Sequence, residues 1–267
     1  MTITITRNGS SILRHLRASR TISTSGKVDL PDVTLYQYAI CPFCHKSKAF
    51  MSYVGMTPTI VEVNPLTKAE LKPWSGDYKK VPIAMVDGER VNGSDEIINK
   101  LLVSTPVQEV LQGKWNDMSM DDFTKDDKWS KFAHNDLAAL IYPNLCRSLS
   151  NSYEAFGYVN DVPNFSSTQK FLVRTIGSLA MYMAASRVKS KRGITDEQQA
   201  LKDVLKQFET MALENGTKKF ASGREDPNMG DITVFGTLRS VEGLAVHDEF
   251  VTGALSDWYN RIKETMT

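Results

Sequence analysis

The segment QYAICPFCHKSKAF, residues 37–50, decides the fold of this chain, because it sets two cysteines at the point where a strand pattern gives way to a helix pattern. Cys41 and Cys44 form a C-x-x-C pair, which is typical of thiol redox and thiol-binding sites. With His45 behind it, the same string also matches the C-x-x-C-H signature of covalent haem attachment. The flanking residues must separate these two chemistries.

Residues 33–39 are β-branched and aromatic and predict a strand, while residues 42–54 predict a helix. Pro42 suits the first helical position, which leaves Cys41 at the exposed start, where free N–H groups and the helix dipole stabilise an anion. Lys46 and Lys48, on the side of the helix away from its apolar residues, add positive charge. We therefore expect a lowered pKa at Cys41 and an ordinary thiol at Cys44, one turn further in.

Two other interpretations of the motif stay open. A structural zinc site needs two further ligands, and the sequence offers no second C-x-x-C and only scattered histidines. Covalent haem attachment requires an exported chain and a second axial ligand, and no later His or Met stands out as that ligand. Thiol chemistry is the favoured interpretation, with no metal bound by protein side chains.

The rest of the chain divides into an α/β part and an all-α part. Residues 57–64 predict a strand, 66–72 a helix, 81–88 and 89–93 two strands, and 94–103 a helix. From about residue 122 only helical patterns remain, at 127–142, 171–190, 195–213 and 230–246. We divide the chain into a targeting or disordered segment (1–30), an α/β domain (31–104), a linker (105–125) and a helical domain (126–267).

Two sequence patterns in the helical part predict a core-facing stripe and a helix N-cap. The side chains of one i, i+4 stripe are expected in the core; they are Leu172, Ile176, Leu179 and Met183. The Asn228-Met229-Gly230-Asp231 string predicts a cap with a reciprocal acidic partner at the start of a helix.

Composition excludes several classes of protein. The 267 residues carry 32 Lys and Arg against 31 Asp and Glu, so no global field favours nucleic acid or an anionic membrane. Three cysteines cannot make a disulfide scaffold and indicate a reducing compartment, with Cys146 a small buried residue. No run of about 18 apolar residues predicts a membrane-spanning helix.

The first thirty residues differ from the rest in kind. They are rich in Arg, Ser and Thr and contain no acidic residue before Asp29. This composition is typical of a mitochondrial presequence, and the alternative is a disordered basic tail on a cytoplasmic or membrane-associated protein.

Two further segments predict a site for a small thiol peptide. Pro82 opens a strand and can present the backbone of Val81 to an extended ligand. Ser94 stands where a helix N-cap belongs, so its hydroxyl and the N–H groups behind it can hold a carboxylate. Together with Cys41, they point to glutathione.

These segments resemble the type 2 prostaglandin E synthase family, a branch of the glutathione-transferase-like proteins. The resemblance rests on CPFC (41–44), VEVNP (61–65), VPIAMV (81–86), YPNLCRS (142–148) and TLRSVEGL (237–244), and it covers residues 33–267. It implies a thioredoxin-like domain followed by a glutathione-transferase-like helical domain, and a homodimer. It also implies isomerisation of the prostaglandin endoperoxide H to prostaglandin E, bound glutathione, and noncovalent haem held by the glutathione sulfur.

Carried over by residue, the resemblance assigns the reactive thiol to Cys41, with Cys44 as the second cysteine and Tyr38 to orient the thiol or donate to the departing oxygen. It assigns glutathione contacts to Val81 with Pro82 and to Ser94. The pocket wall falls on Phe43, Pro143, Asn144 and Arg147.

The chain departs from the family's pattern at three places. Gly93 removes a carboxylate that can hold the glutathione amine, for which Asp95 or Glu96 can substitute. In the wall, the string that begins at Tyr142 also differs from the family's. His45 replaces a small polar residue, and the sequence offers no role for it beyond added positive charge.

Three functional classes therefore remain. The first is an isomerase in which a thiolate attacks the weak O–O bond of a lipid endoperoxide. The second is a general glutathione-dependent oxidoreductase or transferase acting on another electrophile. The third is a noncatalytic haem or glutathione carrier.

Overall fold

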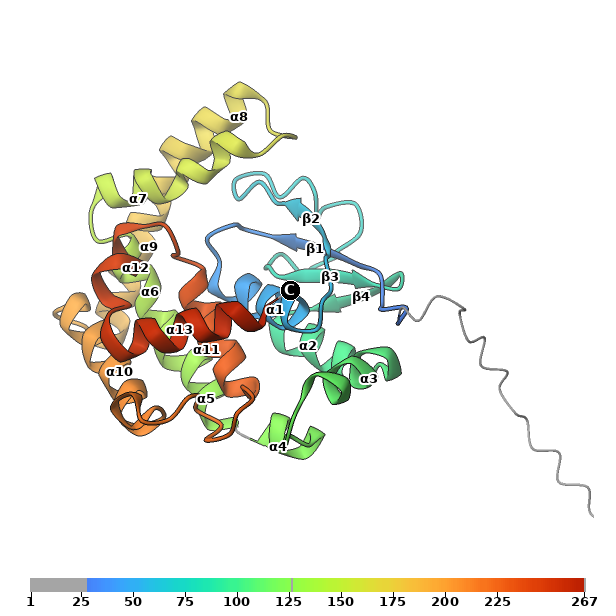
Figure 1. Ribbon diagram of the computed structural model, residues 1–267. Coiled ribbons are helices and arrows are strands. Elements are labelled where there is room, and N and C mark those ends of the chain that lie inside the picture. Colours follow the sequence, from blue (N-terminus) through green and yellow to red (C-terminus); the bar gives the residue numbers. More distant parts are fainter. Residues whose placement is uncertain (1–27, 126, 267) are drawn as a thin grey trace, which may run out of the picture.

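The computed structural model describes residues 28–125 and 127–266, so almost all of the expected targeting segment lies outside the described residues (Figure 1). The first domain is built on a four-stranded sheet in the order β2-β1-β3-β4. Its strands are β1 (Val33–Gln37), β2 (Thr59–Glu62), β3 (Ile83–Val86) and β4 (Glu89–Asn92). β1 runs parallel to β2, and β3 runs antiparallel to both of its neighbours.

Helices α1 (Pro42–Tyr53) and α2 (Ser94–Leu102) pack against each other and against one face of the sheet. Side chains alternate along β1, so Val33 and Leu35 enter the main core while Tyr36 faces the other side. On that other side, a loop covers a small cluster centred on Val63, Leu71 and Ile83. The predicted strands and these two helices are confirmed within a few residues.

The predicted helix at 66–72 is wrong, because this loop runs through successive turns. The Asn64 side chain accepts hydrogen bonds from the N–H groups of Leu66 and Thr67, at 3.0 and 3.2 Å. Lys68 then takes a left-handed φ of 50°. An asparagine that bonds its own backbone two residues on offers the chain a turn in place of a helix.

Two helices, α3 (Thr105–Lys114) and α4 (Met120–Lys125), occupy the segment that we expected to be a linker. The helices and single helical turns that follow are α5 (Asp127–Phe132), η1 (Ala133–Leu137), α6 (Ala138–Leu145), α7 (Leu149–Ala155), η2 (Phe156–Asp161), α8 (Ser167–Leu172), η3 (Val173–Gly177), α9 (Ser178–Arg192), α10 (Glu197–Met211), η4 (Glu214–Gly216), α11 (Met229–Arg239), α12 (Ala245–Phe250) and α13 (Gly253–Thr265). The α/β and all-α parts are therefore confirmed. In the described part of the chain, no helix combines the length and the apolar character needed to cross a bilayer.

The two domains meet along α1 and α11, which lie side by side between the sheet and the other helices in Figure 1. α11 is almost entirely buried and begins with the predicted capping box. The Asn228 side chain accepts from the Asp231 N–H at 3.0 Å, and the Asp231 carboxylate accepts from the Asn228 N–H at 3.1 Å. This reciprocal pair starts the helix that carries the α1 contact.

The predicted core stripe of the helical domain is wrong. Its four side chains, Leu172, Ile176, Leu179 and Met183, are exposed on α8, η3 and α9. The opposite sides of these helices pack on the core through Val173, Met181 and Ala185. The periodicity shows that these side chains share one face of the helix, but it does not show whether that face packs on the core or faces solvent.

Candidate functional site

Cys41 lies directly before the first residue of α1, and Pro42 takes the first helical position as predicted. The Cys41 N–H donates to the Tyr38 carbonyl oxygen at 3.0 Å, which closes the turn between β1 and the helix. Contrary to our expectation, the start of this helix is not exposed: Cys41 is 3% and Cys44 is 0% exposed. The helical domain covers the thiols, because the Tyr142 hydroxyl of α6 bonds to the Cys41 sulfur.

The two thiols of the motif differ in acidity. The hydrogen bond from the Cys44 thiol lowers the pKa of Cys41 and prevails over burial, which acts in the other direction. The N–H groups of Cys44 and Phe43 and the Tyr142 hydroxyl lower it further. Burial, followed by the bond to Cys41, raises the pKa of Cys44 well above its ordinary value. These opposite pKa shifts favour the thiolate form at Cys41, which accepts from Cys44, and the protonated form at Cys44.

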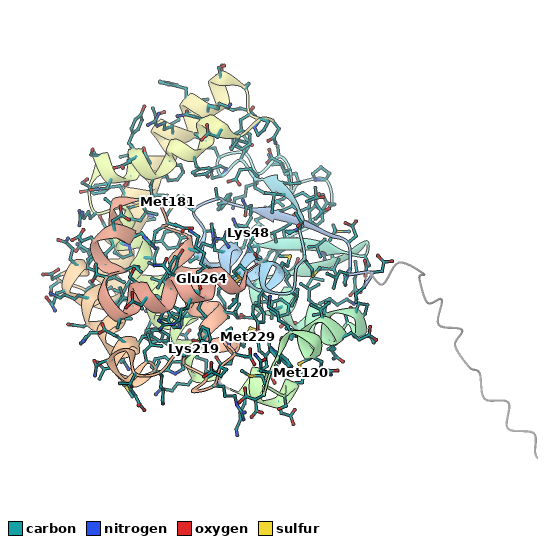
Figure 2. The ribbon with its side chains drawn as sticks, viewed as in Figure 1. Lys48, Met120, Met181, Lys219, Met229 and Glu264 are labelled. Carbon is teal, nitrogen blue, oxygen red and sulfur yellow. The ribbon has the colours of Figure 1, made fainter. Side chains whose placement is uncertain are left out.

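The two lysines of α1 contribute differently from our expectation. Lys46 is 1% exposed and is paired at 2.8 Å with Asp95, so it joins α1 to α2. Lys48, labelled in Figure 2, is the lysine whose charge lowers the pKa of Cys44. Burial in turn lowers the pKa of Lys48.

His45, for which the sequence offered no role, is buried beside the loop that precedes Cys41. Its Nε2 lies 2.7 Å from the Ala39 carbonyl oxygen, and Nδ1 has no partner. Burial, with the nearby charge of Lys48, lowers the pKa of His45 to about 3, so the ring is neutral and its Nε2–H donates to Ala39. This bond occupies the nitrogen that a covalent-haem site would need as axial ligand.

Glu62, at the end of β2, holds the same loop from the other side. Its carboxylate accepts from the Ala39 N–H at 2.8 Å and from the Gln37 side chain at 3.1 Å. The Tyr158 hydroxyl of η2 also donates to it, which ties the helical domain to the loop. Burial raises the pKa of Glu62. Glu62 thereby fixes the backbone between β1 and Cys41.

Tyr38 stands in this loop and belongs to the small cluster on the outer side of the sheet. Burial, followed by the charges of the two cysteines, raises the pKa of Tyr38 to about 12. Tyr38 is therefore protonated at neutral pH and close enough to the thiols to feel their charge; its predicted role in orienting the thiol or donating to the departing oxygen stays a prediction. Tyr142 is the hydroxyl that reaches the Cys41 sulfur, and burial raises its pKa well above the ordinary value.

Val81 and Pro82, joined by a cis peptide bond, precede β3. The Pro82 carbonyl oxygen accepts from the Gly93 N–H at 2.9 Å, whereas the Val81 N–H and C=O have no hydrogen-bond partner within the described residues. Val81 lies in the same cluster as Tyr38 and Tyr78. A free backbone N–H and C=O beside partly exposed aromatic rings suit an extended peptide ligand.

Ser94 is the first residue of α2, and Gly93 occupies the N-cap position that we had assigned to Ser94. The φ of Gly93 is +88°, a conformation that glycine adopts without strain and that other residues rarely take. Backbone geometry therefore accounts for this glycine. A Cβ at Gly93 would lie 3.7 Å from the Tyr78 hydroxyl. Burial, followed by the charges of Cys44 and Cys41, raises the pKa of Tyr78. Tyr78 therefore lies between the thiols and the start of α2.

The predicted wall residues lie in different places. Phe43 packs against His134 of η1 with tilted rings whose centroids are 4.9 Å apart, and Pro143 is buried inside α6. Asn144 donates to the Glu197 carbonyl oxygen at 2.8 Å, and Arg147 pairs with Glu249 at 3.0 Å. Because these partners are inside the helical domain, Asn144 and Arg147 are assigned to its packing, and Tyr142 provides the wall over Cys41.

The groups around the thiols do not fit haem. The Cys41 sulfur accepts hydrogen bonds from the Cys44 thiol and the Tyr142 hydroxyl, and His45 Nε2 donates to the Ala39 carbonyl, so neither group is free to ligate iron. Within residues 28–125 and 127–266, no three His, Cys, Asp or Glu side chains lie close enough to hold a metal ion. Glutathione fits better. The Val81 backbone is free to pair with a peptide on the outer side of the sheet, and the start of α2 follows β4 at the end of the sheet.

Comparison with known proteins agrees with this geometry. Residues 33–91 match the glutaredoxin family. The chain is 32% identical over 73 residues to glutaredoxin 1 of Rickettsia prowazekii, an alignment that covers 26% of this chain and 77% of that protein. It is 28% identical over 291 residues to prostaglandin E synthase 2 of Danio rerio, which covers 95% of this chain and 76% of that protein.

A solved structure extends the likeness to the whole fold. The glutathione S-transferase of Ceriporiopsis subvermispora, crystallised in complex with glutathione, superposes with a TM-score of 0.54 at 12% identity, over 88% of this chain and 98% of that one. The thioredoxin-like domain and the transferase-like helical domain are thus confirmed. The first domain belongs to the glutaredoxin family, and the chain as a whole is similar to the type 2 prostaglandin E synthases, in agreement with the resemblance found in the sequence.

Proposed function

We propose that this protein is a thiol-dependent isomerase that converts the prostaglandin endoperoxide H to prostaglandin E. One observation carries the proposal: the pKa of Cys41 is lowered at the start of α1 in a chain that is similar over 95% of its length to prostaglandin E synthase 2. A lowered pKa makes the thiolate, which is the nucleophile that such chemistry requires, easier to form.

The reaction needs no external oxidant or reductant. The Cys41 thiolate attacks one endoperoxide oxygen, so an S–O bond forms and the O–O bond breaks, and the Tyr142 hydroxyl gives its proton to the freed oxygen. The Tyr142 phenolate then removes the ring proton on the carbon that carries the S–O group. As the C=O bond forms, the S–O bond breaks and the thiolate leaves. Cys44 stabilises the thiolate before the first step and after the last.

Glutathione binds beside the thiols in this proposal and is not consumed, with its backbone along Val81 and its glutamyl carboxylate at Ser94. The first N–H groups of α2 and its dipole favour an anion there. Asp95 is committed to Lys46 and also faces His134 at 3.4 Å, so Glu96 is the remaining carboxylate for the glutathione amine. The homodimer belongs to the same proposal, and the mass of the protein in solution tests it.

Product analysis with the purified endoperoxide tests the activity. We expect prostaglandin E to form faster than by spontaneous decay, and this excess to vanish in Cys41→Ser but not in the matched variant Cys146→Ser, since Cys146 is buried in the helical domain. A Tyr142→Phe variant should retain thiol labelling but lose turnover. Prostaglandin E formation that is equal in Cys41→Ser and the unmodified chain would refute the proposal.

A second candidate is a glutathione-dependent thiol oxidoreductase. The hydrogen bond between Cys41 and Cys44 favours it, because the same two sulfurs can form a disulfide and the domain belongs to the glutaredoxin family. Reduction of a glutathionylated peptide separates the two. An oxidoreductase would turn over this substrate through Cys41 and consume glutathione, whereas an isomerase would not consume glutathione. A chain that binds glutathione but catalyses neither reaction is a carrier.

A further inference from the structure

Exposed apolar side chains follow one another along α8, η3 and α9 at the edge of the helical domain, where α8 (yellow) forms the top of the molecule in Figure 1. We call this set the α8–α9 face, and it consists of Phe171, Leu172, Ile176, Leu179 and Met183. Phe171 is 65% exposed, and the other four are between 39% and 50% exposed. Apolar residues gathered in this way on a monomer surface indicate an interaction site.

The same segment carries charge of one sign. Residues 162–195 contain no acidic residue and six basic ones, which are Lys170, Arg174, Arg187, Lys189, Lys191 and Arg192, in a chain whose net charge is only +1. Lys189 is neutralised by Glu197. Lys170 and Arg192 donate to backbone carbonyl oxygens, which leaves their charges uncompensated.

Two of these cations continue the apolar stripe along α9. Arg187 follows Met183 by one helical turn, and Lys191 follows Arg187 by another, so both lie close to the same side of the helix. Both side chains are exposed, and neither takes part in an ion pair among the described residues. Met181, labelled in Figure 2, points to the opposite side and packs on the core.

We propose that the α8–α9 face binds the surface of an anionic lipid bilayer. Aliphatic and aromatic side chains flanked by unpaired cations match a helix that lies in the interface plane, with its apolar side among the acyl chains and its cations at anionic headgroups. A second copy of the chain is a poorer occupant, because two apposed faces would bring like charges together. This inference does not depend on the proposed activity.

Co-sedimentation of the full chain with vesicles tests the proposal. Vesicles of phosphatidylcholine alone are compared with vesicles of phosphatidylcholine mixed with phosphatidylserine, at low and high salt. We expect binding to the anionic vesicles that weakens with salt, and the double variant Arg187→Glu with Lys191→Glu should bind them at least about tenfold more weakly. Leu179→Ser with Met183→Ser should weaken binding at either salt concentration.

Matched controls come from the exposed side of α10. Lys202→Glu reverses a charge and Met211→Ser removes an exposed apolar side chain away from the α8–α9 face. These should bind as the unmodified chain does, and far-UV circular dichroism should be the same for every variant. The basic residues before position 28 are present in all variants, so they do not contribute to the differences. Equal binding by the Arg187→Glu, Lys191→Glu variant would overturn the proposal. So would an absence of vesicle binding together with a dimer that Leu179→Ser, Met183→Ser dissociates, because the occupant would then be a second copy.

Discussion

Gly236 of α11 and His45 of α1 stand so close that a Cβ on Gly236 would lie 2.8 Å from the His45 carbonyl oxygen. The same Cβ would come within 2.9 Å of the Lys46 Cα and 3.0 Å of the Ala49 Cβ. These neighbours are rigid helix atoms rather than the end of a flexible side chain. The helix that carries the reactive thiol is therefore held against the second domain at a position that admits only glycine.

Gly236→Ala should destabilise the protein. Overpacking of this kind costs about 1–3 kcal/mol in the free energy of unfolding. Gly113→Ala in α3 is the matched control, because a Cβ there meets nothing within 4 Å and should be neutral or stabilising by about 0.5–1 kcal/mol. Urea unfolding of both variants gives the comparison. Equal unfolding free energies would contradict the close packing of α1 on α11.

Alkylation of the thiols should depend on pH in a specific way. Because its pKa is lowered, Cys41 is a thiolate at pH values where an ordinary cysteine is still protonated, and iodoacetamide should label it at mildly acidic pH. Cys44 and Cys146, whose pKa values burial raises, should react only at higher pH or after unfolding. Peptide mapping identifies the labelled residue. Preferential labelling of Cys44 or Cys146 would be the opposite result.

Glu62→Gln should loosen the loop before Cys41. The glutamine amide would turn an N–H group toward the Ala39 N–H or the Gln37 amide, which leaves buried donors unsatisfied at about 1–3 kcal/mol. We expect slower alkylation of Cys41 at acidic pH, since the turn that places it at the start of α1 is less well ordered. Glu70→Gln, which affects the Asn64 N–H elsewhere in the same domain, is the control. Unchanged labelling in Glu62→Gln would assign Glu62 a purely structural role.

Asp231 gives the folded state a pH dependence of its own. Its buried carboxylate accepts from the Trp258 indole at 2.8 Å and from the N–H groups of Ala221, Ser222 and Asn228. Burial nevertheless raises the pKa of Asp231 to about 6. Because the folded pKa lies above the unfolded value near 3.9, the contribution of Asp231 is full below about pH 3.9 and is lost as the pH rises through about 6.

Asp231→Asn should remove this slope from a plot of unfolding free energy against pH. At neutral pH it should also cost about 1–3 kcal/mol, because an amide nitrogen cannot accept from the four donors. The exposed neighbour Asp257→Asn on α13 should change neither quantity. A slope that survives in Asp231→Asn would mean that another group is responsible.

Import into mitochondria remains a proposal that rests on the basic, acid-free composition of the first thirty residues, which fall almost entirely outside the described residues. Fused to a fluorescent reporter, residues 1–32 should direct it to mitochondria. Arg14→Glu with Arg17→Glu should abolish this, because the helix that a presequence forms would lose its cationic side. A diffuse cytosolic signal would leave only a basic tail.

Local sequence determined the elements around the thiol and the order in which they occur. Pro42 set the start of α1, and Asn228 and Asp231 set the start of α11, because caps and first-turn prolines act within a few residues of the chain. The different acidity of Cys41 and Cys44 followed from their positions before and inside that helix. The likeness of the whole chain to a known family supplied the helical domain's fold.

Only the tertiary structure decided which side chains meet at the site. Tyr142 bonds to Cys41, and Glu62 bonds to the loop before it, although both residues are distant from Cys41 in sequence. No local sequence pattern identifies either of them as a site residue. Lys46 was expected in solvent but is buried against Asp95, since the packing of α2 on α1 encloses it. Periodicity identified the stripe of α8 and α9 but not its surroundings, because an apolar face is the same in sequence whether it meets a core or the outside.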